Sequence, residues 1–338
     1  MIKINLNKEK KEKIEKIFLE DLFESDKGQK KDEQKEAVGR FVKILDTDNS
    51  RNLLQKNYRK LYDYFFDDKK GIKKENVKKL LLADKEKMIE LIDKFGSYDF
   101  DNKDHSDKLL NNIFKYKNFS KRKAAYNILK EMGITVCPYC NRIYIMTLKS
   151  GNVRPQFDHY FPKSKYPYLA LSLYNLIPSC SICNMSKSDM DTKSSPILYP
   201  YEEEFGDEVV FTVDIEDKNQ FVKYLRGDSD KIKVHIVNKN FALSNQLENQ
   251  NNRLHITELY NEHKDYIKDL FKNYYINTNE RVRELLNNFP ELFSTEEEVR
   301  SLMLMNDIRK ENWGKRPLAK LTHDIYNELE KLNFSFTF

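Results

Sequence analysis

Apolar side chains recur at helical spacing through the first 130 residues of the chain. Three stripes follow the spacing of an amphipathic helix: Ile14, Ile17, Phe18 and Leu22; Val38, Phe41, Val42 and Leu45; and Met88, Leu91, Ile92 and Phe95. Such stripes pack against a core far more often than they take part in function. We therefore expect residues 1–130 to form a helical region.

The pattern changes at Gly133, where short β-branched and aromatic segments replace the helical stripes. The expected elements are a strand at residues 142–148, a turn at Gly151-Asn152, a returning strand at 153–160 and a helix opening within 183–193. Residues 131–195 are therefore expected to form a small module of their own.

The remainder of the chain, residues 196–338, begins with alternating segments and then returns to helical spacing. Short strands are predicted at residues 209–215, 221–225 and 231–237. From Ile256 onward the apolar positions again fit helices. The sequence therefore predicts an α+β fold, in which a small antiparallel β module lies between mainly helical N- and C-terminal regions.

Composition and charge limit the class of protein. The chain of 338 residues is 33% charged and 12% aromatic, and disordered chains lack such aromatic content. Residues 101–200 carry 15 basic and 7 acidic side chains, whereas residues 201–338 carry 19 and 26. Positive charge near the module suits phosphate binding, although an ordinary solvated surface explains it equally well. No apolar run suggests a signal peptide or membrane span, so we expect a cytoplasmic protein without membrane contact.

The four cysteines form two Cys-x-x-Cys pairs, Cys137 with Cys140 and Cys180 with Cys183. Two such pairs can close a tetrahedral zinc site, and a site that uses every cysteine is structural. A redox motif and plain buried cysteines are the alternatives. A redox motif would need one pair in a βαβ context, which the pattern lacks.

The segment between the two pairs carries residues suited to a second, harder cation. Asp158 offers a carboxylate, and the neighbouring His159 points to the opposite side of a strand unless the strand ends there. This favours Asp158 as metal ligand and His159 as the base that takes a proton from water. Asn184, directly after Cys183, can supply a second ligand oxygen. We expect Asn175 to tie the loop together through side-chain hydrogen bonds.

The run from CPYC to CNMSK resembles the HNH endonuclease family, whose fold is the ββα-metal finger. The matching positions are Asp158, His159, Pro162, Ser164, Asn175, Leu176, Cys180, Cys183, Asn184 and Lys187. The resemblance implies that His159 is the general base, that Asp158 and Asn184 hold a catalytic Mg²⁺ or Mn²⁺, and that Asn175 orients the loop. The implied reaction is hydrolysis of phosphodiester bonds in nucleic acid.

Basic residues of the module are candidates for phosphate contact: Arg154, Lys163, Lys165 and Lys187. DNA is the favoured substrate, and RNA stays open. The segment Lys315–Asp324 also resembles the tails of HNH proteins in bacterial antiphage defence modules, and this resemblance implies an ATPase or another defence-operon protein as partner. The alternative is a zinc-knuckle protein that binds nucleic acid or serves as a scaffold without catalysis.

Overall fold

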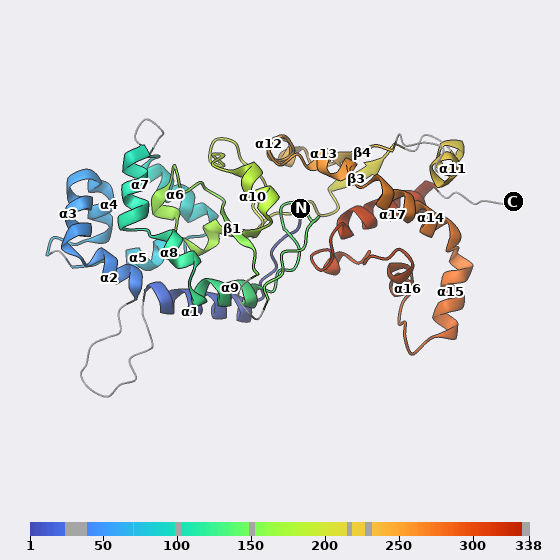
Figure 1. The fold of residues 1–338 in the computed structure, drawn as a ribbon, viewed down its shortest axis with the longest axis horizontal. Helices are drawn as coiled ribbons and strands as arrows, with labels where there is room; N and C mark the ends of the chain where they lie inside the picture. The colour runs from blue at the N-terminus through green and yellow to red at the C-terminus, as the bar shows by residue number, and fades with distance from the viewer. Residues whose placement is uncertain are drawn as a thin grey trace. The chain divides into compact units, whose positions relative to one another are not determined.

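The computed structural model describes residues 1–23, 39–69, 71–98, 103–148, 153–214, 218–226 and 232–332. The chain forms two compact units. The N-terminal unit comprises Asn5–Ile134 and Ile145–Pro196, and the C-terminal unit comprises Met1–Ile4, Thr135–Tyr144 and Ile197–Phe338. Each unit combines helices with a two-stranded antiparallel sheet (Figure 1), so the predicted α+β class is confirmed.

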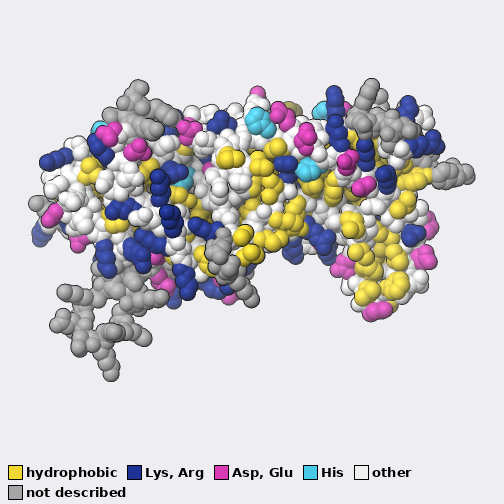
Figure 2. Space-filling view, in the orientation of Figure 1, with side chains coloured by type: hydrophobic (Ala, Val, Ile, Leu, Met, Phe, Trp, Pro, Cys, Tyr) yellow, Lys and Arg dark blue, Asp and Glu magenta, His cyan; other side chains and the backbone are white. Residues whose placement is uncertain are grey.

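Most of the N-terminal unit is helical. Its first helices are α1 (Lys8–Leu22), α2 (Arg40–Leu45), α3 (Asp48–Asn57), α4 (Arg59–Phe65), α5 (Lys74–Leu81), α6 (Lys85–Phe95), α7 (Lys103–Asn112), α8 (Tyr116–Ser120) and α9 (Lys123–Met132). The predicted apolar stripes turn to the core, with Ile14 and Phe18 of α1, Phe41 of α2, and Met88 of α6 buried; Val38 lies outside the described residues. Figure 2 shows Lys and Arg side chains gathered over the outside of these helices.

The sheet of the N-terminal unit joins β1 (Gln156–His159) to β2 (Leu176–Ser179), with Asp158 opposite Ile177. Two short 3-10 helices lie between the strands, η2 (Pro167–Leu169) and η3 (Leu173–Asn175). Directly after β2, α10 (Ser181–Lys187) packs against β1. The order is thus strand, strand and helix. A helix was predicted to open within residues 183–193, whereas α10 already begins at Ser181, between the cysteines of the second pair, and ends at Lys187.

The predicted hairpin partner of β1 was wrong. Residues 142–148 form no strand; Tyr144 makes an isolated bridge to Val136, and the Leu148 amide donates to the Val153 carbonyl at 3.0 Å. Tyr144 and Leu148 are about half exposed, at 49% and 46%. Because β2 is buried at every position, it offers β1 a better-shielded partner. The turn predicted at Gly151-Asn152 lies outside the described residues.

The C-terminal unit is built around β3 (Val209–Val213) and β4 (Val234–Asn238), with α17 (Ala319–Leu332) packed against β3. The predicted strand at 221–225 is wrong, since this segment belongs to a helix. Phe221 and Tyr224 are buried three residues apart and pack on Phe271. The other elements are α11 (Lys218–Arg226), η4 (Phe241–Leu243), α12 (Ser244–Leu254), α13 (Ile256–Asn261), α14 (Lys264–Ile276), α15 (Asn279–Asn288), α16 (Glu296–Met303) and η5 (Lys310–Asn312).

No helix within the described ranges is both long enough and apolar enough to cross a membrane.

Candidate active site

The four cysteines are buried and close together, with their sulfur atoms within 4.8 Å of one another. In a tetrahedral zinc site, bonds of about 2.3 Å place the sulfurs roughly 3.8 Å apart. Four thiolates are also the donor set that structural zinc prefers. The donors and their spacing therefore fit zinc, and the cluster can bind it.

Each cysteine pair sits in a local structure that turns two sulfurs the same way. At Cys137 the amide donates to the Ile143 carbonyl, and the Cys137 carbonyl accepts from the Asn141 amide at 2.8 Å. Cys180 caps α10, where its sulfur accepts from the Cys183 amide at 3.4 Å. A tight turn and a helix start thus provide the two halves of the donor set.

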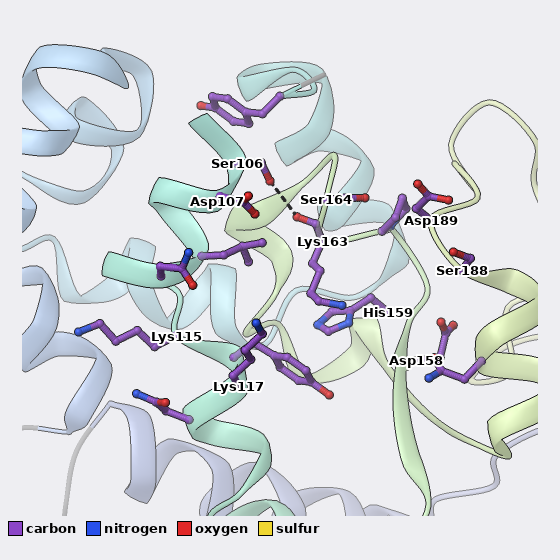
Figure 3. A pocket seen from close by; sticks show the side chains of 17 residues that line it. Ser106, Asp107, Lys115, Lys117, Asp158, His159, Lys163, Ser164, Ser188 and Asp189 are labelled. Atoms are coloured by element: carbon purple, nitrogen blue, oxygen red, sulfur yellow. Dashed lines mark hydrogen bonds between the residues drawn. The ribbon is translucent and has the colours of Figure 1, made fainter. Parts of the chain in front are cut away.

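A pocket of about 700 Å³ in the N-terminal unit brings together three of the predicted catalytic residues, Asp158, His159 and Asn184. Figure 3 shows His159 near the middle of this pocket and Asp158 to one side. Asp158 and His159 come from the end of β1, and Asn184 comes from α10. Pairing of β1 with β2, followed directly by α10, therefore assembles residues that lie 25 positions apart in the sequence.

His159 is held as a neutral imidazole. Its Nε2 lies 3.2 Å from the Ala170 carbonyl, and because a carbonyl only accepts, Nε2 carries the proton and Nδ1 keeps its lone pair. The Tyr116 ring meets the imidazole edge-on at 4.3 Å between centroids. Burial, followed by the charge of Lys163, places the pKa of His159 well below its usual value. A neutral ring with an available nitrogen can act as a base.

Asp158 is paired with a lysine that is entirely buried. The Lys187 Nζ lies 3.1 Å from Asp158 Oδ2 and donates to the His159 carbonyl at 2.6 Å. None of the Lys187 side chain is exposed, and only 3% of that of Asp158. Lys187 was expected to contact phosphate; the structure places its ammonium inside, where it connects the two neighbouring residues of β1.

The two asparagines take different positions. The side chain of Asn184 donates through Nδ2 to Gln156 Oε1 at 2.6 Å. Its side-chain oxygen Oδ1 makes no hydrogen bond within the described part of the chain. Asn175 is fully buried. Its oxygen accepts from the Phe161 amide at 2.7 Å, and its Nδ2 donates to the carbonyls of Phe161 and Leu169. Asn175 thus ties together the loop that follows His159.

Oxygen donors suited to a hard cation therefore line the pocket: the Asp158 carboxylate and the Asn184 amide oxygen. These are the residues that could hold Mg²⁺ or Mn²⁺. The side-chain oxygen Oδ1 of Asn184 accepts no hydrogen bond within the described residues. It can therefore bind a cation without losing a hydrogen bond.

The other predicted phosphate contacts differ in their surroundings. Lys163 lines the pocket, and its Nζ lies 5.7 Å from the centre of the Tyr116 ring. Lys165 pairs with Asp191 at 3.4 Å, and Arg154 donates to the Ser120 carbonyl. Of these three, Lys163 is the one placed beside His159.

Sequence reasoning missed the pocket residues that come from the helical region. Lys115, Tyr116 and Lys117 line the pocket with Asn111 and Asn118. The alternation of basic and aromatic residues at positions 115–117 is a signal of nucleic-acid contact. It lies about 40 residues before Asp158, and only the packing of α7 and α8 brings it to the pocket.

Comparison with known proteins finds a partial similarity. The chain is 36% identical over 72 residues to the Septu protein PtuB of Bacillus thuringiensis. The aligned part is 21% of this chain and 26% of that relative, so the chain spans about a quarter of the relative's length. No family model matches the chain, and no solved structure matches it.

Proposed function

We propose that the protein is a metal-dependent nuclease of the HNH type, which hydrolyses phosphodiester bonds in nucleic acid, with DNA favoured over RNA. The observation that carries the proposal is the pocket shared by Asp158, His159 and Asn184. A neutral buried imidazole beside two oxygen donors is the set that water activation and cation binding require.

In the proposed reaction, His159 Nδ1 accepts a proton from a water molecule as that water attacks phosphorus. As the new phosphorus–oxygen bond forms, the bond from phosphorus to the sugar oxygen breaks, and that oxygen leaves with a proton taken from solvent. Asp158 and Asn184 would hold the divalent ion, which would supply stabilisation of negative charge on the phosphate and the leaving oxygen. The hydrogen bond from Nε2 to the Ala170 carbonyl fixes the tautomer and the orientation of the ring. It therefore keeps Nδ1 deprotonated.

We also propose a role in antiphage defence. The partial similarity to a Septu protein and the resemblance to HNH proteins of defence modules point the same way. An ATPase or another product of a defence operon would then be the partner that controls the nuclease. The zinc site would fold the cysteine-bearing segments and take no part in the reaction.

The test is plasmid cleavage with Mg²⁺ or Mn²⁺, by the chain alone and with its operon partner. His159→Ala should lower the rate by about 10²- to 10⁴-fold, the range for loss of a general base. His105→Ala is the matched control, since His105 belongs to the same unit but does not line the pocket, and it should cleave at the wild-type rate.

Two results would defeat the proposal. A wild-type protein that cleaves neither DNA nor RNA, with or without the partner, would favour the non-catalytic zinc-knuckle protein. A His159→Ala variant as active as the wild type would remove His159 from the role of base.

A further inference from the structure

The pocket that holds His159 has a second wall, which the catalytic proposal leaves without a role. This α8 wall consists of Lys115, Lys117 and Asn118. Figure 3 shows Lys115 and Lys117 across the pocket from Asp158, on the helical side. The wall belongs to the helical region, to which the sequence assigns no activity.

The lysines of this wall differ from Lys165, which pairs with Asp191. Within the described ranges, neither Lys115 nor Lys117 forms an ion pair with an acidic side chain. Lys163 lines the same pocket: burial lowers its pKa most, the charge of Asp158 acts in the opposite direction, and the charges of Lys187 and Lys117 lower it further. Ammonium groups that repel one another beside a hollow favour an anion there.

The acidic residues of the pocket lie elsewhere. Asp107 and Asp189 are drawn in the upper part of Figure 3, whereas Lys115 and Lys117 occupy its lower part. Asp158 is compensated by Lys187. On the face drawn in Figure 2, Lys and Arg side chains also gather over the region of α5 and α8.

We propose that the α8 wall binds the phosphates next to the one attacked at His159, and that the pocket accepts an unpaired nucleic-acid strand rather than a duplex. This inference rests on the proposed function, because it takes His159 as the place of attack. Binding at the α8 wall and the preference for a strand over a duplex can both be measured without cleavage.

The size of the pocket supports an unpaired strand. The pocket has a volume of about 700 Å³. Pockets of about 300–1,000 Å³ enclose ligands of drug size, a class that includes a single nucleotide. Enzymes that do chemistry on a base in such a pocket act on single strands or extrude the nucleotide.

Binding of a labelled oligonucleotide to the chain of 338 residues tests the inference. Divalent ions are left out so that no cleavage occurs. Fluorescence anisotropy compares one DNA strand with the duplex of the same sequence. The strand should bind more tightly than the duplex. The variant with Lys115→Ala and Lys117→Ala should bind the strand at least about tenfold more weakly than the wild type. The magnitude of its slope of log affinity against log salt should be smaller by about 1.4, because each of two lost phosphate contacts on a single strand contributes about 0.7.

The matched control is the variant with Lys121→Ala and Lys123→Ala. These lysines are exposed, follow α8 in the chain and do not line the pocket, so the variant makes the same change in net charge. It should keep affinity and salt slope close to those of the wild type. Matching circular dichroism spectra would show that both variants fold.

Duplex binding as tight as strand binding would overturn the inference, and so would equal effects of the two double variants. Neither result touches the proposed function, which depends on cleavage that requires His159. Conversely, strand binding that requires Lys115 and Lys117 in a protein that never cleaves would keep the binding site and remove the nuclease.

Discussion

Replacing Lys187 by methionine should strongly destabilise the N-terminal unit. Methionine keeps most of the side-chain volume but removes the ammonium 3.1 Å from Asp158 Oδ2. At that distance two charges attract by about 5 kcal/mol with an effective dielectric constant of about 20. Removing one partner of a buried pair leaves an uncompensated charge and costs about 3 to 5 kcal/mol. The unfolding equilibrium should therefore shift by roughly two to three and a half orders of magnitude.

Urea unfolding followed by circular dichroism measures this loss. Lys165→Met is the matched control, because its partner Asp191 also lies in the N-terminal unit but their side chains are 22% and 16% exposed. Because this pair is partly exposed, it should contribute less to stability than the fully buried pair of Lys187 with Asp158. Adding Asp158→Asn to Lys187→Met removes the stranded charge and should recover much of the stability. If Lys187→Met lowers the free energy of unfolding no more than Lys165→Met does, Lys187 does not compensate the charge of Asp158.

Two further predictions concern zinc and acid. Metal analysis should find about one zinc per chain. The Cys180→Ser variant should lose the zinc, and its cysteine-bearing segment should no longer fold cooperatively. Full zinc content in that variant would contradict the four-cysteine site. The side chain of Arg309 binds Asp307 at 2.8 Å and lowers the pKa of that carboxyl to about 2. The pKa is lowered on folding, so the stabilisation is present above the unfolded value of 3.8 and is lost as the pH falls toward 2. Because Asp307 is only partly buried, Asp307→Asn should cost about 1 kcal/mol at pH 6 and almost nothing near pH 2 in urea unfolding; a constant difference between these pH values would refute the assignment.

Elements whose burial follows from local spacing could be predicted from the sequence. Phe41 of α2 and Met88 of α6 belong to stripes that repeat every three or four residues, and both are fully buried. The segment Phe221–Leu225 was predicted as a strand. Its apolar residues occupy positions 221, 222, 224 and 225, a spacing that also fits a helix, and Phe221 and Tyr224 both pack on Phe271 from one side of that helix. Tertiary contact overrode a pattern too short to distinguish the two.

Strand pairing could not be predicted locally. Residues 142–148 have the composition of a strand and lie close to β1 in sequence, yet β1 pairs with β2, about 20 residues downstream. β2 is buried at all four positions and contains Pro178, so it lacks both the alternation and the full set of donors expected of a strand. In a sheet of two strands, the amide that Pro178 lacks can fall on the unpaired edge. The same long-range packing accounts for the α8 wall, which no motif near Asp158 indicates.

The end of β1 explains how two adjacent residues can serve one pocket. Successive side chains of a strand point to opposite faces, and Asp158 and His159 do meet different neighbours. Asp158 faces Lys187 of α10, whereas His159 contacts Tyr116 of α8 and the Ala170 carbonyl. Both nevertheless line the same pocket, because β1 ends at His159 and the hollow lies where the strand stops. Because their neighbours differ, the charge states of the two residues are set independently. Lys187 compensates the charge of the Asp158 carboxylate, while burial keeps the His159 imidazole neutral. An Asp-His pair in the middle of a strand would be divided between two faces and could not share one phosphate.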